Sequence, residues 1–116
     1  MTDSVNDLAR ALQNFAIDRD WGQFHSPKNL ATALAVESGE LLEHFQWLTE
    51  DQSRDLPEPV RSAVAAEVAD VLLYMIQLCT SLGIDPIAAA QEKLLVNGEK
   101  YPIEQSRGTS KKYDRL

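Results

Sequence analysis

The chain has 116 residues, 25% of them charged, with a formal net charge of −7 and one cysteine, Cys79. This length predicts a single domain over residues 1–116 that buries roughly two-thirds of its unfolded surface. The single cysteine excludes an internal disulfide and a cysteine-rich zinc site. The longest uncharged stretch, Val71 to Ile84, has 14 residues, fewer than the about 20 of a membrane span. Residues 1–20 contain aspartates and no apolar block, so we expect a soluble, cytoplasmic protein without membrane contact.

Helical spacing of apolar residues begins near the N-terminus. The first predicted helix runs from about Ser4 to Ile17, with Ser4 and Asp7 in an arrangement like a capping box. The second is predicted from Ser26, a capping residue followed by a proline suited to the first turn, to about Leu48.

Residues 49–56 are polar and acidic and predict a loop. A third helix is expected from Pro57–Pro59 to Gly83, and a fourth from Asp85 to Gly98, because proline is tolerated in a first turn and glycine favours a left-handed stop. Residues 102–116 form a polar tail without period, expected to be disordered or ordered by a ligand or a partner subunit.

This pattern predicts an all-α fold resembling a four-helix bundle. The apolar residues of the third helix, from Val64 to Leu82, surround most of its circumference, so the helix must be covered on several sides. Four short helices cannot provide that cover alone, and we therefore expect a homo-oligomer.

Charge is distributed unevenly along the chain. Residues 1–98 hold six basic and fifteen acidic side chains, whereas residues 99–116 hold five basic and three acidic ones. The acidic body argues against binding of a nucleic acid polymer. A phosphate ligand would need metal ions to bridge it to the carboxylates, with the basic tail as a second contact.

Two pairs of carboxylates interrupt the apolar faces of the long helices. Glu37 and Glu40 lie on the second helix, and Glu67 and Asp70 on the third, each pair spaced i, i+3 and therefore on one face. Burying bare carboxylates costs several kcal/mol each, and no lysine or arginine falls at matching positions. Mg²⁺ prefers oxygen ligands and bridges carboxylates to phosphates, so a metal site is one interpretation and a pair of solvated helix faces is the other. A di-iron centre would need Glu-x-x-His, which is absent.

Aromatic and polar residues share these faces. Tyr74 follows Asp70 by four residues, Trp47 follows Glu40 by seven, and Trp21 and His25 precede the second helix. They could stack a flat base and bond to its edge, or the tryptophans could simply close the ends of the bundle. Lys93, Asn97 and Lys100 form one stripe on the fourth helix, either solvated or in contact with phosphate and ribose.

The order of these motifs resembles a known family. Glu37-x-x-Glu40, a gap of 26 residues and Glu67-x-x-Asp70 are similar to the signature of the MazG-like all-α nucleoside triphosphate pyrophosphohydrolases. The dCTP pyrophosphatase branch is the more similar one, on the following segments: residues 19–25, 27–29, 37–41, 45–47, 67–74, Lys93-x-x-x-Asn97, 100–102, 106–108 and 112–113.

The resemblance implies a helical bundle that assembles into a tetramer and hydrolyses a nucleoside triphosphate, dCTP or a modified dCTP, to the monophosphate and pyrophosphate. The residues to which it assigns roles are Glu37, Glu40, Glu67 and Asp70 as Mg²⁺ ligands; Trp21, His25, Trp47 and Tyr74 in the base and sugar pocket; Lys93, Asn97, Lys100 and Tyr101 on the nucleotide; and Arg107 and Lys112 on phosphate.

The expected mechanism is direct attack of water on the α-phosphorus, with Glu37 or Glu40 orienting the water. The expected role is cleansing of the nucleotide pool. Two alternatives remain open at this point: a pyrophosphohydrolase for another nucleotide, such as dUTP or a damaged base, and a non-enzymatic helical oligomerisation module with a vestigial acidic site.

Overall fold

The computed structural model describes residues 4–116, and these residues form helices and connecting turns without strands. The all-α class predicted from sequence is confirmed. The chain forms two compact units, residues 1–83 and 84–116, which are described separately. The prediction of one domain stays a prediction.

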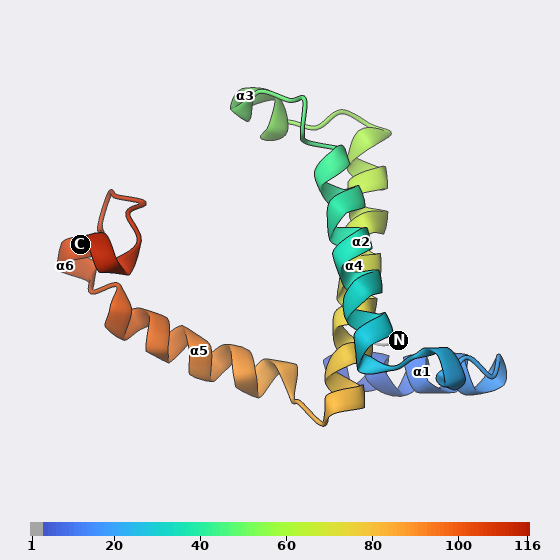
Figure 1. Cartoon of the computed structure of the whole chain (residues 1–116). Coiled ribbons are helices and arrows are strands. Elements are labelled where there is room, and N and C mark those ends of the chain that lie inside the picture. Colours follow the sequence, from blue (N-terminus) through green and yellow to red (C-terminus); the bar gives the residue numbers. More distant parts are fainter. Residues whose placement is uncertain (1–3) are drawn as a thin grey trace. The chain divides into compact units, whose positions relative to one another are not determined.

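The first unit contains three long helices, α1 (Val5–Asp18), α2 (Pro27–Glu43) and α4 (Val60–Leu82), with a 3₁₀ turn η1 (Gly22–Phe24) and a short helix α3 (Glu50–Ser53). Helices α2 and α4 run antiparallel side by side along most of their length (Figure 1). Helix α1 packs on α4. The site described below lies along these three helices.

Side-chain hydrogen bonds and backbone conformation determine where these helices begin and end. The hydroxyl of Ser4 accepts a hydrogen bond from the Asp7 amide, and that of Ser26 accepts one from the Asn29 amide, so both predicted N-caps are confirmed. Gly83 closes α4 in the left-handed conformation at φ 67°, as predicted for a residue without a Cβ.

Helix α2 ends at Glu43, not near Leu48 as predicted. Beyond Glu43 the chain tightens into i→i+3 hydrogen bonds, such as that from the Phe45 amide to the Leu42 carbonyl, and forms turns over residues 44–47. Trp47 therefore lies outside the helix.

The segment predicted as a loop contains helix α3. Thr49 and Gln52 form a reciprocal capping box, with the Thr49 hydroxyl accepting from the Gln52 amide and the Gln52 side chain accepting from the Thr49 amide. Two satisfied donors are enough to start one helical turn in a polar segment.

The second unit contains α5 (Pro86–Lys100), α6 (Ile103–Ser106) and η2 (Tyr113–Arg115). Asp85 caps α5 as predicted, but the helix continues through Gly98 to Lys100. Instead of an irregular tail, residues 102–116 include two short helical segments. The ring of Tyr113 packs edge-on against Tyr101, at 6.1 Å between centroids, and Lys100 Nζ lies 4.8 Å from the centroid of the same ring.

Little of the apolar surface is buried within the described chain. Leu30, Ile76 and Cys79 are the only buried residues among residues 4–116, so the extensive core expected for this length is not found in these residues. Along α4, Val68, Leu72 and Met75 are 49%, 46% and 40% exposed and follow the spacing i, i+4, i+7, which places them on one face.

Helix α4 also meets the length and composition criterion for a membrane span, with a mean hydropathy of 1.5 in an 18-residue window. The sequence expectation, based on uncharged stretches alone, did not include this helix. The criterion is weak evidence for a span, because the core helix of a soluble protein meets it equally well.

Candidate metal and nucleotide site

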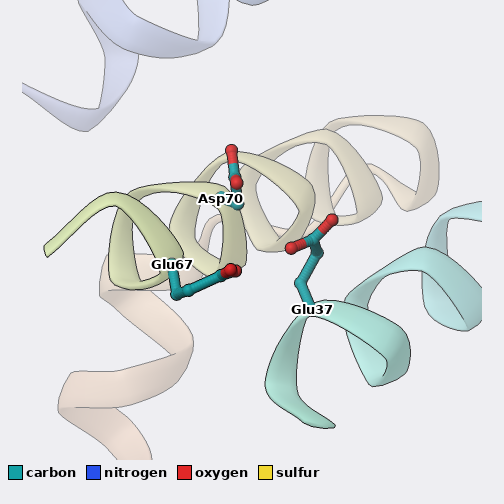
Figure 2. Close-up of side chains that lie close together, drawn as sticks. All are labelled: Glu37, Glu67 and Asp70. Carbon is teal, nitrogen blue, oxygen red and sulfur yellow. The ribbon is translucent and has the colours of Figure 1, made fainter. Parts of the chain in front are cut away.

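Three carboxylates converge between α2 and α4. Figure 2 shows Glu37 on α2 and Glu67 on α4 extending towards each other, with Asp70 one turn further along α4. Each of the three offers an oxygen, and these oxygens lie within 4.8 Å of one another. The i, i+3 spacing of Glu67 and Asp70 brings both to the same side of α4, and the packing of α2 on α4 adds Glu37.

No lysine or arginine among residues 4–116 forms an ion pair with the cluster. One oxygen of Glu37 and one of Glu67, both Oε2, are buried without a hydrogen-bond partner among the described residues. An unpaired buried acceptor is costly, so the cluster is a candidate site for a metal ion.

Glu40 lies one turn beyond Glu37 on α2 and is half-buried. It is outside the group of three carboxylates, but it acts on Glu37. A hydrogen bond with the Glu40 carboxyl, followed by burial and by the Glu67 and Asp70 carboxylates, raises the pKa of Glu37 to about 7. Crowding of like charges favours the neutral acid, and a cation would reverse that effect.

A pocket of about 400 Å³ lies between α1 and α4 and reaches the cluster through Asp70. Trp21, His25 and Tyr74, three of the four residues predicted to hold a base and sugar, contribute to its lining. The complete lining is Leu8, Ala11, Leu12, Phe15, Trp21, His25, Asp70, Leu73, Tyr74 and Gln77.

The aromatic side chains of the pocket support one another. The Trp21 ring packs edge-on against Phe15, at 5.6 Å between centroids, and against His25, at 6.3 Å. The guanidinium carbon of Arg19 lies over the ring of Phe15, 3.6 Å from its centroid. Trp21 is 44% exposed, so its ring is fixed by contacts on its edges while part of its surface stays accessible.

Trp47 is not brought to this pocket. It is 87% exposed in the turns after α2 and is absent from the pocket lining. The remaining predicted contact residues all belong to the second unit: Lys93, Asn97 and Lys100 on α5, and Tyr101, Arg107 and Lys112 beyond it. Their contact with a nucleotide stays a prediction.

Sequence reasoning missed six of the ten lining residues: Leu8, Ala11, Leu12, Phe15, Leu73 and Gln77. A signal for Gln77 was present, because it follows Asp70 by seven residues and Tyr74 by three and thus shares their face of the helix. Phe15 and Leu73 were indistinguishable from ordinary core residues, since apolar side chains line pockets and cores alike.

A MazG-like family model matches residues 32–116, and the chain therefore belongs to the MazG-like family. It is 40% identical over 115 residues to dCTP pyrophosphatase 1 of Mus musculus, across 97% of this chain and 68% of that protein. It is 38% identical over 119 residues to dCTP pyrophosphatase 1 of Homo sapiens, with the same two shares covered.

Among solved structures, the fold is similar to a pyrophosphatase from Archaeoglobus fulgidus DSM 4304. The TM-score is 0.81 at 38% identity, over 88% of this chain and 95% of that one.

Proposed function

We propose that the chain is a nucleoside triphosphate pyrophosphohydrolase that converts dCTP, or a dCTP with a modified base, to the monophosphate and pyrophosphate. Its family membership and its identity to proteins named dCTP pyrophosphatase 1 support this activity. The observation that carries the proposal is the convergence of Glu37, Glu67 and Asp70, of which Asp70 also lines an aromatic pocket.

The donor set fits a hard divalent cation. It consists of carboxylate oxygens, two of them buried without a partner among residues 4–116, and has no competing lysine or arginine. Mg²⁺ is the cation we propose, held by Glu37, Glu67 and Asp70, with Glu40 as a further ligand on the strength of the family resemblance. When bound, the ion neutralises charge on the triphosphate and polarises its phosphoryl oxygens.

The pocket beside the cluster would receive the nucleoside. Trp21, Phe15 and Tyr74 offer aromatic surfaces to a planar base, and His25 offers a polar edge. Because Asp70 lines both the pocket and the acidic cluster, a base in the pocket brings the phosphate nearest the sugar towards the carboxylates. This positioning selects the α-phosphorus for attack.

The reaction is an in-line displacement by water. A bond forms between the water oxygen and the α-phosphorus, and the bond from the α-phosphorus to the bridging oxygen breaks, leaving its electron pair on pyrophosphate. Glu37 or Glu40 orients the water and accepts its proton. No covalent intermediate is required, and both carboxylates act from their positions on α2.

Residues of the second unit are proposed to complete the nucleotide contacts, with Lys93, Asn97, Lys100 and Tyr101 on the nucleotide and Arg107 and Lys112 on phosphate. Trp47 is proposed as a further base contact, from the family resemblance. A homo-tetramer is part of the proposal. Its support is the apolar surface left uncovered on α4 and α5, where Leu94 and Leu95 are 72% and 73% exposed.

The test is hydrolysis of a nucleotide panel with Mg²⁺ and with pyrophosphate release as the readout. We expect dCTP, or a dCTP modified on the base, to give the highest kcat/KM. A higher value for dUTP or for a nucleotide with a damaged base would reassign the substrate. No turnover of any nucleotide would leave the oligomerisation module as the better interpretation.

The cellular role proposed with this activity is removal of unwanted nucleotides from the pool available for synthesis. A cytoplasmic location is proposed with it, because the substrates are soluble nucleotides.

A further inference from the structure

Gln77 is a polar side chain that the proposed mechanism does not use. It lies on α4 and lines two cavities, the pocket of about 400 Å³ and a second cavity of about 130 Å³. Leu12 and His25 are the other residues common to both linings. The Gln77 carboxamide is therefore at the boundary between the two spaces, at the end of the pocket away from the carboxylates.

The amide oxygen of Gln77 is buried and has no hydrogen-bond partner among residues 4–116. Buried amide oxygens are normally paired, and an unpaired one destabilises the fold. Trp21, His25 and Tyr74 of the pocket lining have side-chain donors, but none of them forms a hydrogen bond with this oxygen. The missing donor is therefore one that a molecule entering the pocket could bring.

The register along α4 fits a nucleotide lying parallel to the helix. Asp70, Tyr74 and Gln77 follow the spacing i, i+4, i+7 on the face that lines the pocket. At 1.5 Å per residue, Gln77 is about 10 Å along the axis from Asp70. That distance is comparable to the reach from the α-phosphate of a nucleotide to the far edge of its pyrimidine ring.

The geometry points to Gln77 as a specificity-determining residue that reads the polar edge of the base. This inference rests on the proposed function, since it assumes that the base occupies the pocket and the phosphates lie near the carboxylates. The ligand group in question is an exocyclic amine on a pyrimidine, which donates to the vacant oxygen of the carboxamide.

Cytosine and uracil differ at this position. Cytosine presents an amino group, a donor, where uracil presents a carbonyl oxygen, an acceptor. An acceptor facing the Gln77 oxygen would leave both unpaired in an apolar pocket, and sites built around hydrogen bonds reject such analogues strongly. The terminal torsion of glutamine is soft, so this discrimination requires the oxygen, and not the amide nitrogen, of the carboxamide to face the base.

The experiment compares kcat and KM for dCTP and dUTP in the wild type and in Gln77→Met, which keeps the length of the side chain and removes its hydrogen bonds. We expect KM for dCTP to rise about tenfold, the loss of one hydrogen bond, with kcat little changed, because the contact binds ground state and transition state equally. The ratio of kcat/KM for dCTP to that for dUTP should fall by a similar factor.

The matched control is Thr80→Val, one turn further along α4. Thr80 lines only the smaller cavity, and its hydroxyl donates to the Ile76 carbonyl. This variant should leave the ratio between the two nucleotides unchanged. If Gln77→Met fails to fold, Gln77→Glu serves instead; its carboxylate accepts from the cytosine amine and repels the uracil carbonyl, so the ratio should rise.

A ratio unchanged in the folded Gln77 variant, with both nucleotides affected equally, would overturn the inference and leave Gln77 a structural residue. A wild type with equal kcat/KM for dCTP and dUTP would overturn it as well. Absence of turnover by the wild type with any nucleotide is a different outcome, because it contradicts the proposed function itself.

Discussion

At the scale of single residues, the acidic cluster is defined by what its members lack. Glu37 and Glu67 each bury an oxygen without a partner among the described residues, and a buried charge is tolerated in proteins only when it is paired or coordinates a metal. The cluster therefore has a cost in the free protein, and relief of that cost is available to a cation that binds there.

Removing one charge from the cluster tests this. Glu67→Gln and Asp70→Asn keep the shape of the side chain, and each should lower kcat/KM by about 100-fold or more, since loss of even an outer-shell partner of a metal costs 10–100-fold. The helices should stay formed, measured by circular dichroism. Glu43→Gln is the control, because Glu43 is an exposed carboxylate at the end of the same helix as Glu37. This variant should leave kcat/KM nearly unchanged. Wild-type rates in either cluster variant at saturating Mg²⁺ would show that the site has been misidentified.

The raised pKa of Glu37 gives a prediction about pH. Its pKa is 4.5 in the unfolded chain and about 7 in the folded one, so the native state holds more protons between these values. Without metal, the contribution of Glu37 to the free energy of unfolding should therefore fall as the pH rises from about 4.5 to 7. Urea denaturation in chelator at several pH values measures this fall, and Glu37→Gln should abolish it.

Mg²⁺ should oppose this loss of stability with rising pH. A cation binds the deprotonated carboxylate, so its affinity should rise over the same pH interval and level off above it. A metal affinity independent of pH between 5 and 7, determined by calorimetry, would argue against Glu37 as a ligand.

At the scale of elements, helix starts could be predicted from sequence better than helix ends. Ser4, Ser26 and Asp85 cap their helices as expected because a side-chain oxygen satisfies free amides wherever the chain begins to coil. Gly98 was misread as a stop. Glycine ends a helix when a left-handed residue is required, and inside a helix it costs only about 1 kcal/mol, which α5 tolerates.

The candidate site shows the same contrast between residues inside a predicted helix and residues beyond its true end. Glu37, Glu67 and Asp70 could be predicted because two i, i+3 pairs on long helices leave little freedom in where the carboxylates lie. Trp47 was assigned to the carboxylate face by counting turns of a helix that ends four residues before it. Counting helical turns assigns a residue to a face only while the helix continues. Beyond the end of the helix, tertiary contacts determine where the side chain lies.

The uncovered face of α4 gives a prediction for this element. Val68, Leu72 and Met75 lie on one face and are about half exposed, and such a surface is typical of an interface. Leu72→Glu should convert the proposed oligomer to smaller species in sedimentation, because burying an unpaired carboxylate opposes association. Asn6→Glu adds the same charge at an exposed position on α1 and should leave the oligomer intact. A wild type that sediments as a monomer would contradict the proposed tetramer.

At the scale of the whole molecule, the arrangement of pocket and cluster is the basis for proposing attack at the α-phosphorus. Asp70 belongs to both, so a base held against Trp21 and Tyr74 brings its α-phosphate, the phosphate nearest the sugar, closest to the carboxylates. The sequence has no Gly-x-x-x-x-Gly-Lys-Ser/Thr segment, which leaves a phosphate loop directed at the γ-phosphate unsupported.

Hydrolysis of dCTP in ¹⁸O-water distinguishes the possible positions of attack. Attack at the α-phosphorus forms the new bond to dCMP, so mass analysis should find the label in the monophosphate and unlabelled pyrophosphate. Label in pyrophosphate would mean attack at the β-phosphorus and a nucleotide bound in another register relative to Asp70. Stepwise release of single phosphates would contradict a pyrophosphohydrolase altogether.

Repeating the measurement with Gln77→Met separates binding of the base from orientation of the water. Weaker binding of the base should slow the reaction at low substrate concentration. The label should still enter the monophosphate, because the carboxylates and not the base contact orient the water.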